Sequence, residues 1–152
     1  MRILDIFTPQ RKIGNIGERE AAKFLRKNGY RIVEKNYVAL GAEIDIIAKN
    51  KEVTAFVEVK TRNVKYLGYK ESRPGASVTP EKQRKIIKAA SFYSAHHPTN
   101  TRLRFDVIEV YTEDDTRGIK VREIKHLVGC FDKNSAFDRG YHYKHSKEGS
   151  VL

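Results

Sequence analysis

The sequence predicts one α/β domain in which a central mixed β-sheet is flanked by α-helices. Two observations indicate this fold class: apolar residues recur at helical spacing in two segments, and five other segments are rich in Val, Ile and Tyr. Their order along the chain is helix, three strands, helix, two strands, or αβββαββ. A chain of 152 residues has room for a single core and not for a second full domain.

The first helix is predicted over residues 13–28, where helix formers alternate with apolar residues and Gly29 follows as a C-cap. Three strands rich in β-branched residues are then expected, over residues 30–38, 42–48 and 53–61. The polar residues 49–52 between the last two of these strands predict a hairpin turn.

The second helix is predicted from Thr79, a good N-cap, through Pro80 at the first helical position to about His96. Two more strands are expected over residues 103–112 and 119–127, separated by a polar turn. We therefore expect an N-terminal extension, the domain itself and an extended or partly disordered tail, over residues 1–12, 13–128 and 129–152.

Composition excludes the membrane and disulfide-rich classes. No apolar run approaches the roughly 20 residues that span a bilayer, and the opening residues hold only a short apolar stretch before Pro9. Cys130 is the single cysteine, so an internal disulfide is excluded and no zinc-ligand pattern surrounds it. We expect a cytoplasmic protein without membrane contact, in which Cys130 is a packed thiol.

The charge balance points to a polyanionic partner. The chain has 30 Lys and Arg against 19 Asp and Glu, a formal net charge of +11. Much of the excess lies between Lys60 and Lys88, where nine basic residues stand against two acidic ones. This segment includes residues 62–77, whose Gly and Pro content predicts a mobile loop.

A group of charged residues is predicted on two adjacent apolar strands. Because alternate residues of a strand share a face, Glu58 and Lys60 should emerge together, and so should Glu43 and Asp45, with Ile44 and Ile46 opposite them. A hairpin loop of two or four residues places Asp45 on the same face as Glu58, whereas an odd loop separates them. Charges on central strands are costly unless they are paired or bind a metal.

A third acid completes the predicted site. Glu18 lies at helical spacing from Ala21, Ala22 and Leu25, so it should face the sheet. Carboxylates that share a cleft repel one another, and Mg²⁺ or Mn²⁺ relieves the repulsion, activates water and neutralises charge at phosphorus. Lys60 would orient the attacking water or stabilise the transition state electrostatically. The alternative interpretation makes Glu58 and Lys60 an exposed decoration or a structural ion pair with Asp45.

Several segments in order resemble a known family, and the resemblance spans roughly residues 14–137. They read GNIGEREAAKFLRKNGY, GAEIDIIA, FVEVKTR, RFDVIEV and IKHL. Together they resemble the YraN-like family of uncharacterised bacterial proteins, and the first three look like those of archaeal Holliday junction resolvases and the PD-(D/E)XK nuclease superfamily.

The resemblance implies a restriction-endonuclease-like core and a metal site. It places the helix acid at Glu18, the motif's aspartate at Asp45 and the D/E-x-K pair at Glu58 and Lys60, with Glu43 as an additional ligand. The implied activity is a Mg²⁺- or Mn²⁺-dependent endonuclease acting on structured or branched DNA. Junction-cutting relatives are symmetric dimers, so a homodimer stays open, with Phe131 and Phe137 as candidate interface residues.

The basic residues after Lys60 have two interpretations. Those on the second helix can be a solvated face, or they can bind phosphates flanking a cut together with the basic residues of the loop. Tyr66 and Tyr69 are candidates for stacking on exposed bases. The candidate nucleic-acid-binding residues are Arg62, Lys65, Lys70, Arg73, Lys82, Arg84, Lys85 and Lys88.

The remaining polar candidates are predicted to be structural. His96 and His97 precede Pro98 at a helix end, where a capping role is expected, and His126 lies beside a strand end. Asp106 is expected to be a buried or edge polar group. Two alternative functions stay open for the chain: a non-catalytic nucleic-acid-binding protein that keeps the nuclease fold, and a protein-interaction module whose carboxylates are structural ion pairs.

Overall fold

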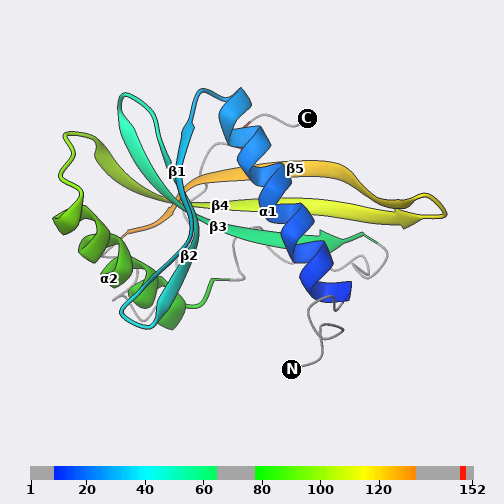
Figure 1. The fold of residues 1–152 in the computed structure, drawn as a ribbon, viewed down its shortest axis with the longest axis horizontal. Helices are drawn as coiled ribbons and strands as arrows, with labels where there is room; N and C mark the ends of the chain where they lie inside the picture. Colours follow the sequence, from blue (N-terminus) through cyan, green and yellow to red (C-terminus); the bar gives the residue numbers. More distant parts are fainter. Residues whose placement is uncertain (1–8, 65–77, 133–147, 150–152) are drawn as a thin grey trace.

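The computed structural model describes residues 9–64, 78–132 and 148–149, and its elements follow the predicted order (Figure 1). The α/β class is confirmed. A two-residue strand comes after the five predicted strands. The bounds are α1 Pro9–Lys27, β1 Arg31–Ala39, β2 Ala42–Lys49, β3 Val53–Asn63, α2 Pro80–His96, β4 Arg102–Asp115, β5 Gly118–Phe131 and β6 Glu148–Gly149.

The sheet is mixed, as predicted, with the strands in sequence order from β1 to β6. β3 and β4 are parallel, and every other neighbouring pair is antiparallel. Parallel neighbours need a long crossover, and α2 lies within the connection between β3 and β4. Figure 1 shows the β4–β5 hairpin extending beyond both helices.

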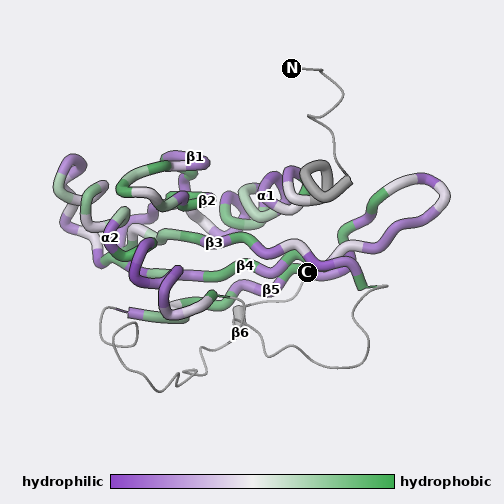
Figure 2. The backbone as a smooth tube through the Cα atoms, turned by 90° about the horizontal axis from the view of Figure 1, so that it is seen from below, coloured by the Kyte–Doolittle hydropathy of each residue, from purple (hydrophilic) through white to green (hydrophobic). Residues whose placement is uncertain are grey.

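The two helices cover opposite faces of the sheet. On one face, Ala21, Ala22 and Leu25 of α1 pack in a cluster with Val57 and Ile108. On the other face, α2 packs against strand residues in a second cluster. Phe56 is the largest fully buried residue of this cluster. Figure 2 shows hydrophobic stretches along the central strands and α1 above them. The core is therefore an α/β/α sandwich.

The N-terminal part of β2 is not paired with β3. The β2–β3 ladder ends at the pair of Ile46 with Val57, while β2 continues to pair with β1 as far as Ala42. Ile44 and Ile46 are buried whereas Glu43 and Asp45 are more exposed, so the predicted alternation holds along β2. The two isoleucines nevertheless pack in different core clusters, because a two-stranded ribbon twists strongly once it leaves the sheet.

Several predicted boundaries need correction, among them the end of β4, which lies at Asp115 and not at residue 112. α1 begins at Pro9, four residues before the predicted start, and β3 continues to Asn63, so Arg62 lies in a strand and not in a loop. β5 extends to Phe131, which is 7% exposed and stacks on Phe105 with ring centroids 5.0 Å apart. Phe131 is therefore a core residue and not an exposed interface residue. Phe137 lies outside the described residues.

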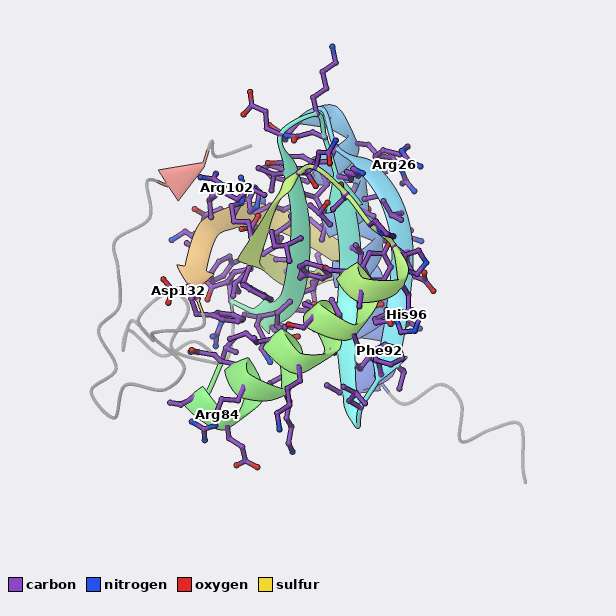
Figure 3. All side chains as sticks on the ribbon, turned by 90° about the vertical axis from the view of Figure 1, so that its left-hand side faces the viewer. Arg26, Arg84, Phe92, His96, Arg102 and Asp132 are labelled. Atoms are coloured by element: carbon purple, nitrogen blue, oxygen red, sulfur yellow. The ribbon has the colours of Figure 1, made fainter. Side chains whose placement is uncertain are left out.

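The structural roles predicted for the histidines are confirmed. Nδ1 of His96 lies 2.8 Å from the Phe92 carbonyl oxygen and Nδ1 of His97 lies 3.0 Å from that of Tyr93, so both rings bind carbonyl groups of the last turns of α2. Figure 3 shows Phe92 and His96 together on this part of the helix. His126 is buried, and its Nε2 lies 2.8 Å from Oδ2 of Asp106.

Asp106 is the centre of a buried polar network. It is fully buried and accepts two hydrogen bonds from Arg104, at 2.8 and 2.7 Å, and one from the Gly129 amide at 2.9 Å. Arg104 also donates to the Tyr30 hydroxyl at 2.7 Å. The network therefore joins β4, β5 and the start of β1 on the face that α1 covers.

The thiol of Cys130 is half-buried and donates to the Leu127 carbonyl at 3.1 Å. Burial raises the pKa of this thiol to about 12, so it is unreactive at neutral pH, as expected for a packed cysteine. Among the described helices, neither is long and apolar enough to cross a membrane.

Candidate functional site

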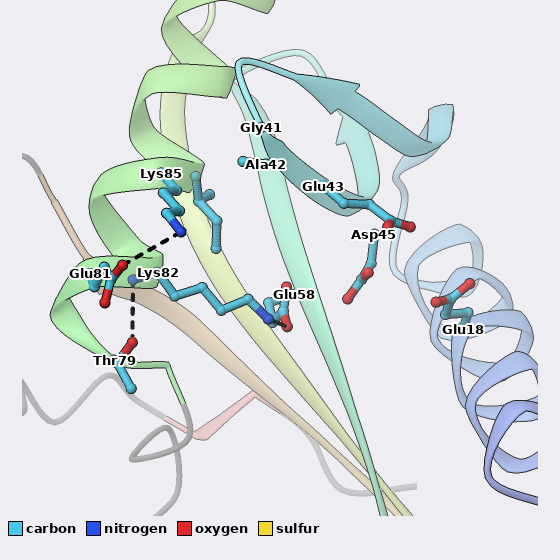
Figure 4. Close-up of a pocket in the computed structure, with 11 residues that line it drawn as sticks. Glu18, Gly41, Ala42, Glu43, Asp45, Glu58, Thr79, Glu81, Lys82 and Lys85 are labelled. Atoms are coloured by element: carbon cyan, nitrogen blue, oxygen red, sulfur yellow. Dashed lines mark hydrogen bonds and ion pairs between the residues drawn. The ribbon is translucent and has the colours of Figure 1, made fainter.

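A pocket of about 620 Å³ lies where β2 separates from β3. The four acids predicted from the sequence all line it, although they come from three different elements (Figure 4). Lys82 and Lys85 reach it from α2. The four acids are Glu18 of α1, Glu43 and Asp45 of β2, and Glu58 of β3.

Asp45 occupies the point of separation between the two strands. The ladder pairs Lys49 with Thr54 across four intervening residues, and its continuation places Asp45 opposite Glu58. This is the even spacing that the site requires. Oδ2 of Asp45 accepts a hydrogen bond from the Val59 amide at 2.8 Å. The side chain therefore binds a backbone donor of β3 just beyond the last ladder pair.

Glu58 forms the inner wall of the pocket. Its side chain is only 5% exposed, because it lies on the face of β3 that α2 covers, next to Phe56. Nζ of Lys60 lies 3.1 Å from Oε1 of Glu58, and Nζ of Lys82 donates a hydrogen bond to the same oxygen. Two ammonium groups therefore share one carboxylate oxygen.

Glu18 reaches the pocket because α1 approaches β3 very closely. A Cβ atom added to Gly17 would lie 1.8 Å from Oγ1 of Thr61, so only glycine fits at this crossing. Glu18 is the next residue and is half-buried, while Ala21, Ala22 and Leu25 beyond it are fully buried. The predicted orientation of Glu18 toward the sheet is confirmed.

The acids of the pocket influence one another's ionisation. Burial and the neighbouring charge of Glu58 raise the pKa of Asp45 to about 7, although the hydrogen bond from Val59 opposes the rise. Burial also raises the pKa of Glu18, and the charge of Glu43 adds to the effect. The carboxylates therefore share one electrostatic environment, in which an added positive charge would be stabilised.

The carboxylates of the pocket suit a hard cation, but in this structure they are not arranged around one. All four acids offer oxygen, the ligand type that Mg²⁺ and Mn²⁺ prefer. In their present positions, no three acidic, histidine or cysteine side chains of the described residues are close enough together to hold a metal ion. Occupation would require the carboxylates to move closer together, and Oε1 of Glu58 is already shared by two lysines.

Lys60 and Lys82 differ in their access to the pocket. Lys82 lines it and its side chain is 40% exposed, whereas Lys60 is 27% exposed and is not among the described lining residues. Burial alone would lower the pKa of Lys82, but its hydrogen bond with Glu58 raises the pKa above the ordinary value. Lys82 is therefore charged at neutral pH.

The sequence left two interpretations of Lys82 open: part of a solvated helix face, or a phosphate-binding residue. Its side chain extends from the first turn of α2 to the buried Glu58, so it is not simply part of a solvated face (Figure 4). No sequence signal distinguishes it from the neighbouring lysines, because the reach of one long side chain depends on how the helix lies over the strand. The contact of Gly17 with Thr61 was missed for the same reason.

The other predicted nucleic-acid-binding residues are spread over several positions. Lys85 lines the pocket and pairs with Glu81 at 3.5 Å, and Lys88 is exposed on the same helix. Arg84 is half-buried near the start of α2 (Figure 3). Arg62 lies 3.6 Å from the buried Glu109. Outside the described residues lie Lys65, Lys70 and Arg73, with Tyr66 and Tyr69.

The family model for the uncharacterised protein family UPF0102 matches residues 17–110 of this chain. The chain belongs to this family. The matched segment runs from Gly17 at the helix–strand crossing into β4, so it contains all the pocket residues named above. The predicted membership of the YraN-like group is thereby confirmed at the level of the family.

Curated UPF0102 proteins from several bacteria match over most of their length. A relative from Chlorobium phaeobacteroides is 42% identical over 122 residues, which cover 78% of this chain and 93% of the relative. One from Chlorobaculum parvum is 46% identical over 122 residues, covering 78% and 91%. A third, from Caldanaerobacter subterraneus, is 37% identical over 123 residues, covering 80% and 96%.

Proposed function

We propose that this UPF0102 protein is a divalent-metal-dependent endonuclease that hydrolyses phosphodiester bonds in structured or branched DNA. The observation that carries the proposal is the convergence of four acids from α1, β2 and β3 in one pocket, beside lysines from β3 and α2. A strongly basic chain with such a pocket suits a polyanionic substrate.

In this proposal the acids hold Mg²⁺ or Mn²⁺. Asp45 and Glu58 bind the ion, Glu18 binds it directly or through water, and Glu43 is an additional ligand at the exposed rim. When bound, the ion supplies an activated water and neutralises charge that develops on phosphorus. The hydrogen bond from Val59 keeps one oxygen of Asp45 fixed, which leaves the other oxygen for a ligand.

The basic residues have separate roles in the proposal. Lys60 stays beside Glu58 and orients the attacking water by its positive charge. Lys85 and Lys88 lie on the solvent side of α2, where they can bind phosphates on either side of the cut. Such contacts fix the position of the strand without reading its sequence.

The test is cleavage of branched and single-stranded DNA by the purified chain with Mn²⁺. Asp45→Ala and Glu58→Ala are expected to abolish cleavage, because each removes a metal ligand. A matched control is Glu34→Ala, which removes an exposed acid of β1 outside the pocket lining. Cleavage that survives unchanged in both pocket variants would contradict the proposal.

A second candidate function is nucleic-acid binding without catalysis. The present arrangement favours it in one respect, because Oε1 of Glu58 is bonded to two lysines and not free for a cation. This function predicts binding that weakens steeply with salt, no cleavage with any divalent ion, and no effect of Lys60→Ala on affinity.

A further inference from the structure

We propose that Lys82 competes with the divalent cation for Glu58, and that it is a positioning residue for the site. This inference rests on the proposed function, and it adds the step that prepares the pocket. The contact that carries it is the hydrogen bond from Nζ of Lys82 to Oε1 of the buried Glu58.

The position of Lys82 is fixed at its backbone and adjustable at its charged end. Thr79 caps α2 and accepts a hydrogen bond from the Lys82 amide at 3.2 Å, so the first turn of the helix is held in place. The side chain then extends across the pocket to Glu58 (Figure 4). Its 40% exposure leaves solvent-accessible space into which the ammonium group can turn.

Lys60 cannot take the same role. It lies two residues from Glu58 on the same strand, so its ammonium stays beside the carboxylate, and it is outside the described pocket lining. Lys85 cannot take it either, because it pairs with Glu81 on its own helix. Lys82 is therefore the pocket lysine whose charge neutralises the acids while no cation is bound.

A cation bound to Glu58 would lie within a few ångströms of the Lys82 ammonium, where two positive charges repel each other strongly. In this proposal the Lys82 ammonium then turns from Glu58 to the solvent-exposed side of the pocket, toward Thr79 and the carboxylate of Glu81. A substrate phosphate near that rim would receive it. The Lys82 side chain thus couples metal binding at Glu58 to phosphate binding at the rim of the pocket.

The experiment measures Mn²⁺ affinity by isothermal titration in the absence of DNA. Lys82→Met keeps the alkyl stem and removes the charge, so it is expected to tighten Mn²⁺ binding about tenfold or more, a size typical of groups next to a metal site. Lys82→Arg keeps the charge and is expected not to tighten binding. Lys23→Met is the matched control, because Lys23 is an exposed lysine of α1 outside the pocket lining, and its affinity is expected within about twofold of wild type.

The same titration separates this inference from the proposed function. If Asp45→Asn abolishes Mn²⁺ binding while Lys82→Met leaves affinity unchanged or weaker, the metal site stands and the competition is overturned. If the wild-type chain and Asp45→Asn bind Mn²⁺ equally, the metal site itself is overturned. Lys82→Gln serves as a second neutral variant. Far-ultraviolet circular dichroism of each variant checks that the fold is retained.

Discussion

Asp45 has a carboxylate that the fold makes difficult to ionise. Its pKa is raised from an ordinary value of 3.8 to about 7, so the folded chain binds a proton there more tightly than the unfolded chain does. The stability that the protonated Asp45 contributes is fully present below the ordinary pKa of 3.8, and it is lost as the pH rises through the folded value of about 7. Deprotonated Asp45 is destabilising without a cation, which is the usual condition of a ligand kept ready to bind.

Asp45→Asn is expected to be more stable than wild type at pH 8 without metal, and equally stable near pH 4. The difference should be on the order of 2 kcal/mol, since a pKa difference of one corresponds to about 1.4 kcal/mol and partial exposure reduces the effect. Urea unfolding at several pH values measures it. Parallel pH profiles for the two proteins would contradict the assignment of the raised pKa to Asp45.

If the pocket binds metal as proposed, Glu18→Gln is expected to weaken Mn²⁺ binding about tenfold or more, because it would remove a charged oxygen ligand or the partner of a bound water. Glu20→Gln is the matched control, since Glu20 lies on the same helix outside the pocket lining and near Lys23, at 3.9 Å. Isothermal titration distinguishes the two variants. Equal affinities would place Glu18 outside the metal site.

At the scale of elements, the crossing of α1 over β3 depends on Gly17. Gly17→Ala is expected to destabilise the fold by about 1–3 kcal/mol, because the new methyl group overlaps Thr61 and pushes the helix away from the strand. Gly14→Ala is the control within the same helix. A Cβ atom there meets no atom within 4 Å, so alanine should be neutral or stabilise by about 0.5–1 kcal/mol.

Thermal or urea unfolding of the two glycine variants checks this prediction. The double variant with Thr61→Ala should recover part of the stability lost in Gly17→Ala, since it removes the Oγ1 atom that the methyl group would meet. A Gly17→Ala protein as stable as Gly14→Ala would show that α1 does not depend on this contact.

Elements and their pairing were predictable from the sequence where a local pattern determines them. The N-cap at Thr79 was predicted correctly, because capping depends on nearby residues. The hairpin between β2 and β3 has the even spacing that was stated as the condition for Asp45 and Glu58 to share a face. The packing of Ile44 and Ile46 in different core clusters was not predictable, since it arises where β2 leaves β3. Phe131 was misplaced because the strand period fades near the bulge-forming Gly129, which has a φ of 62°.

For the candidate site, the sequence predicted four of the five described acids that line the pocket, but not the pairing of Glu58 with a lysine of α2. Asp45 and Glu58 are recognisable because they lie in strongly apolar strands, and Glu18 because it lies at helical spacing from apolar residues. Lys82 resembles any other lysine of a basic helix, and only the packing of α2 over the sheet brings it to Glu58. Contacts between distant elements are set by tertiary packing, which no local pattern records.

At the scale of the whole molecule, the network around Asp106 joins the start of β1 to β4 and β5. Burial alone would raise the pKa of Asp106, but the hydrogen bonds from His126 and Arg104 outweigh it and hold the pKa below the ordinary value. The stability from this ionised group is present above the ordinary pKa of 3.8 and is lost as the pH falls through the lower folded value.

Asp106→Asn is expected to destabilise the fold by about 3 kcal/mol or more at pH 7, because it leaves the mostly buried guanidinium of Arg104 without a counter-charge. Glu113→Gln, which removes one member of an exposed pair with Arg122, should cost less than about 1 kcal/mol. Urea unfolding at pH 7 compares them. Similar losses in both variants would mean that the network does not hold the sheet together.

The hydrogen bond from the Val59 amide to Asp45 makes one backbone position sensitive to the pocket. An amide held in a strand ladder exchanges its proton for deuterium when the sheet opens, whereas the Val59 amide needs only the Asp45 side chain to turn away. Its exchange rate, followed by nuclear magnetic resonance, therefore reports side-chain motion at one atom. A ligand that rotates Asp45 would accelerate isotope exchange at Val59 and leave the ladder amides of β3 and β4 unchanged.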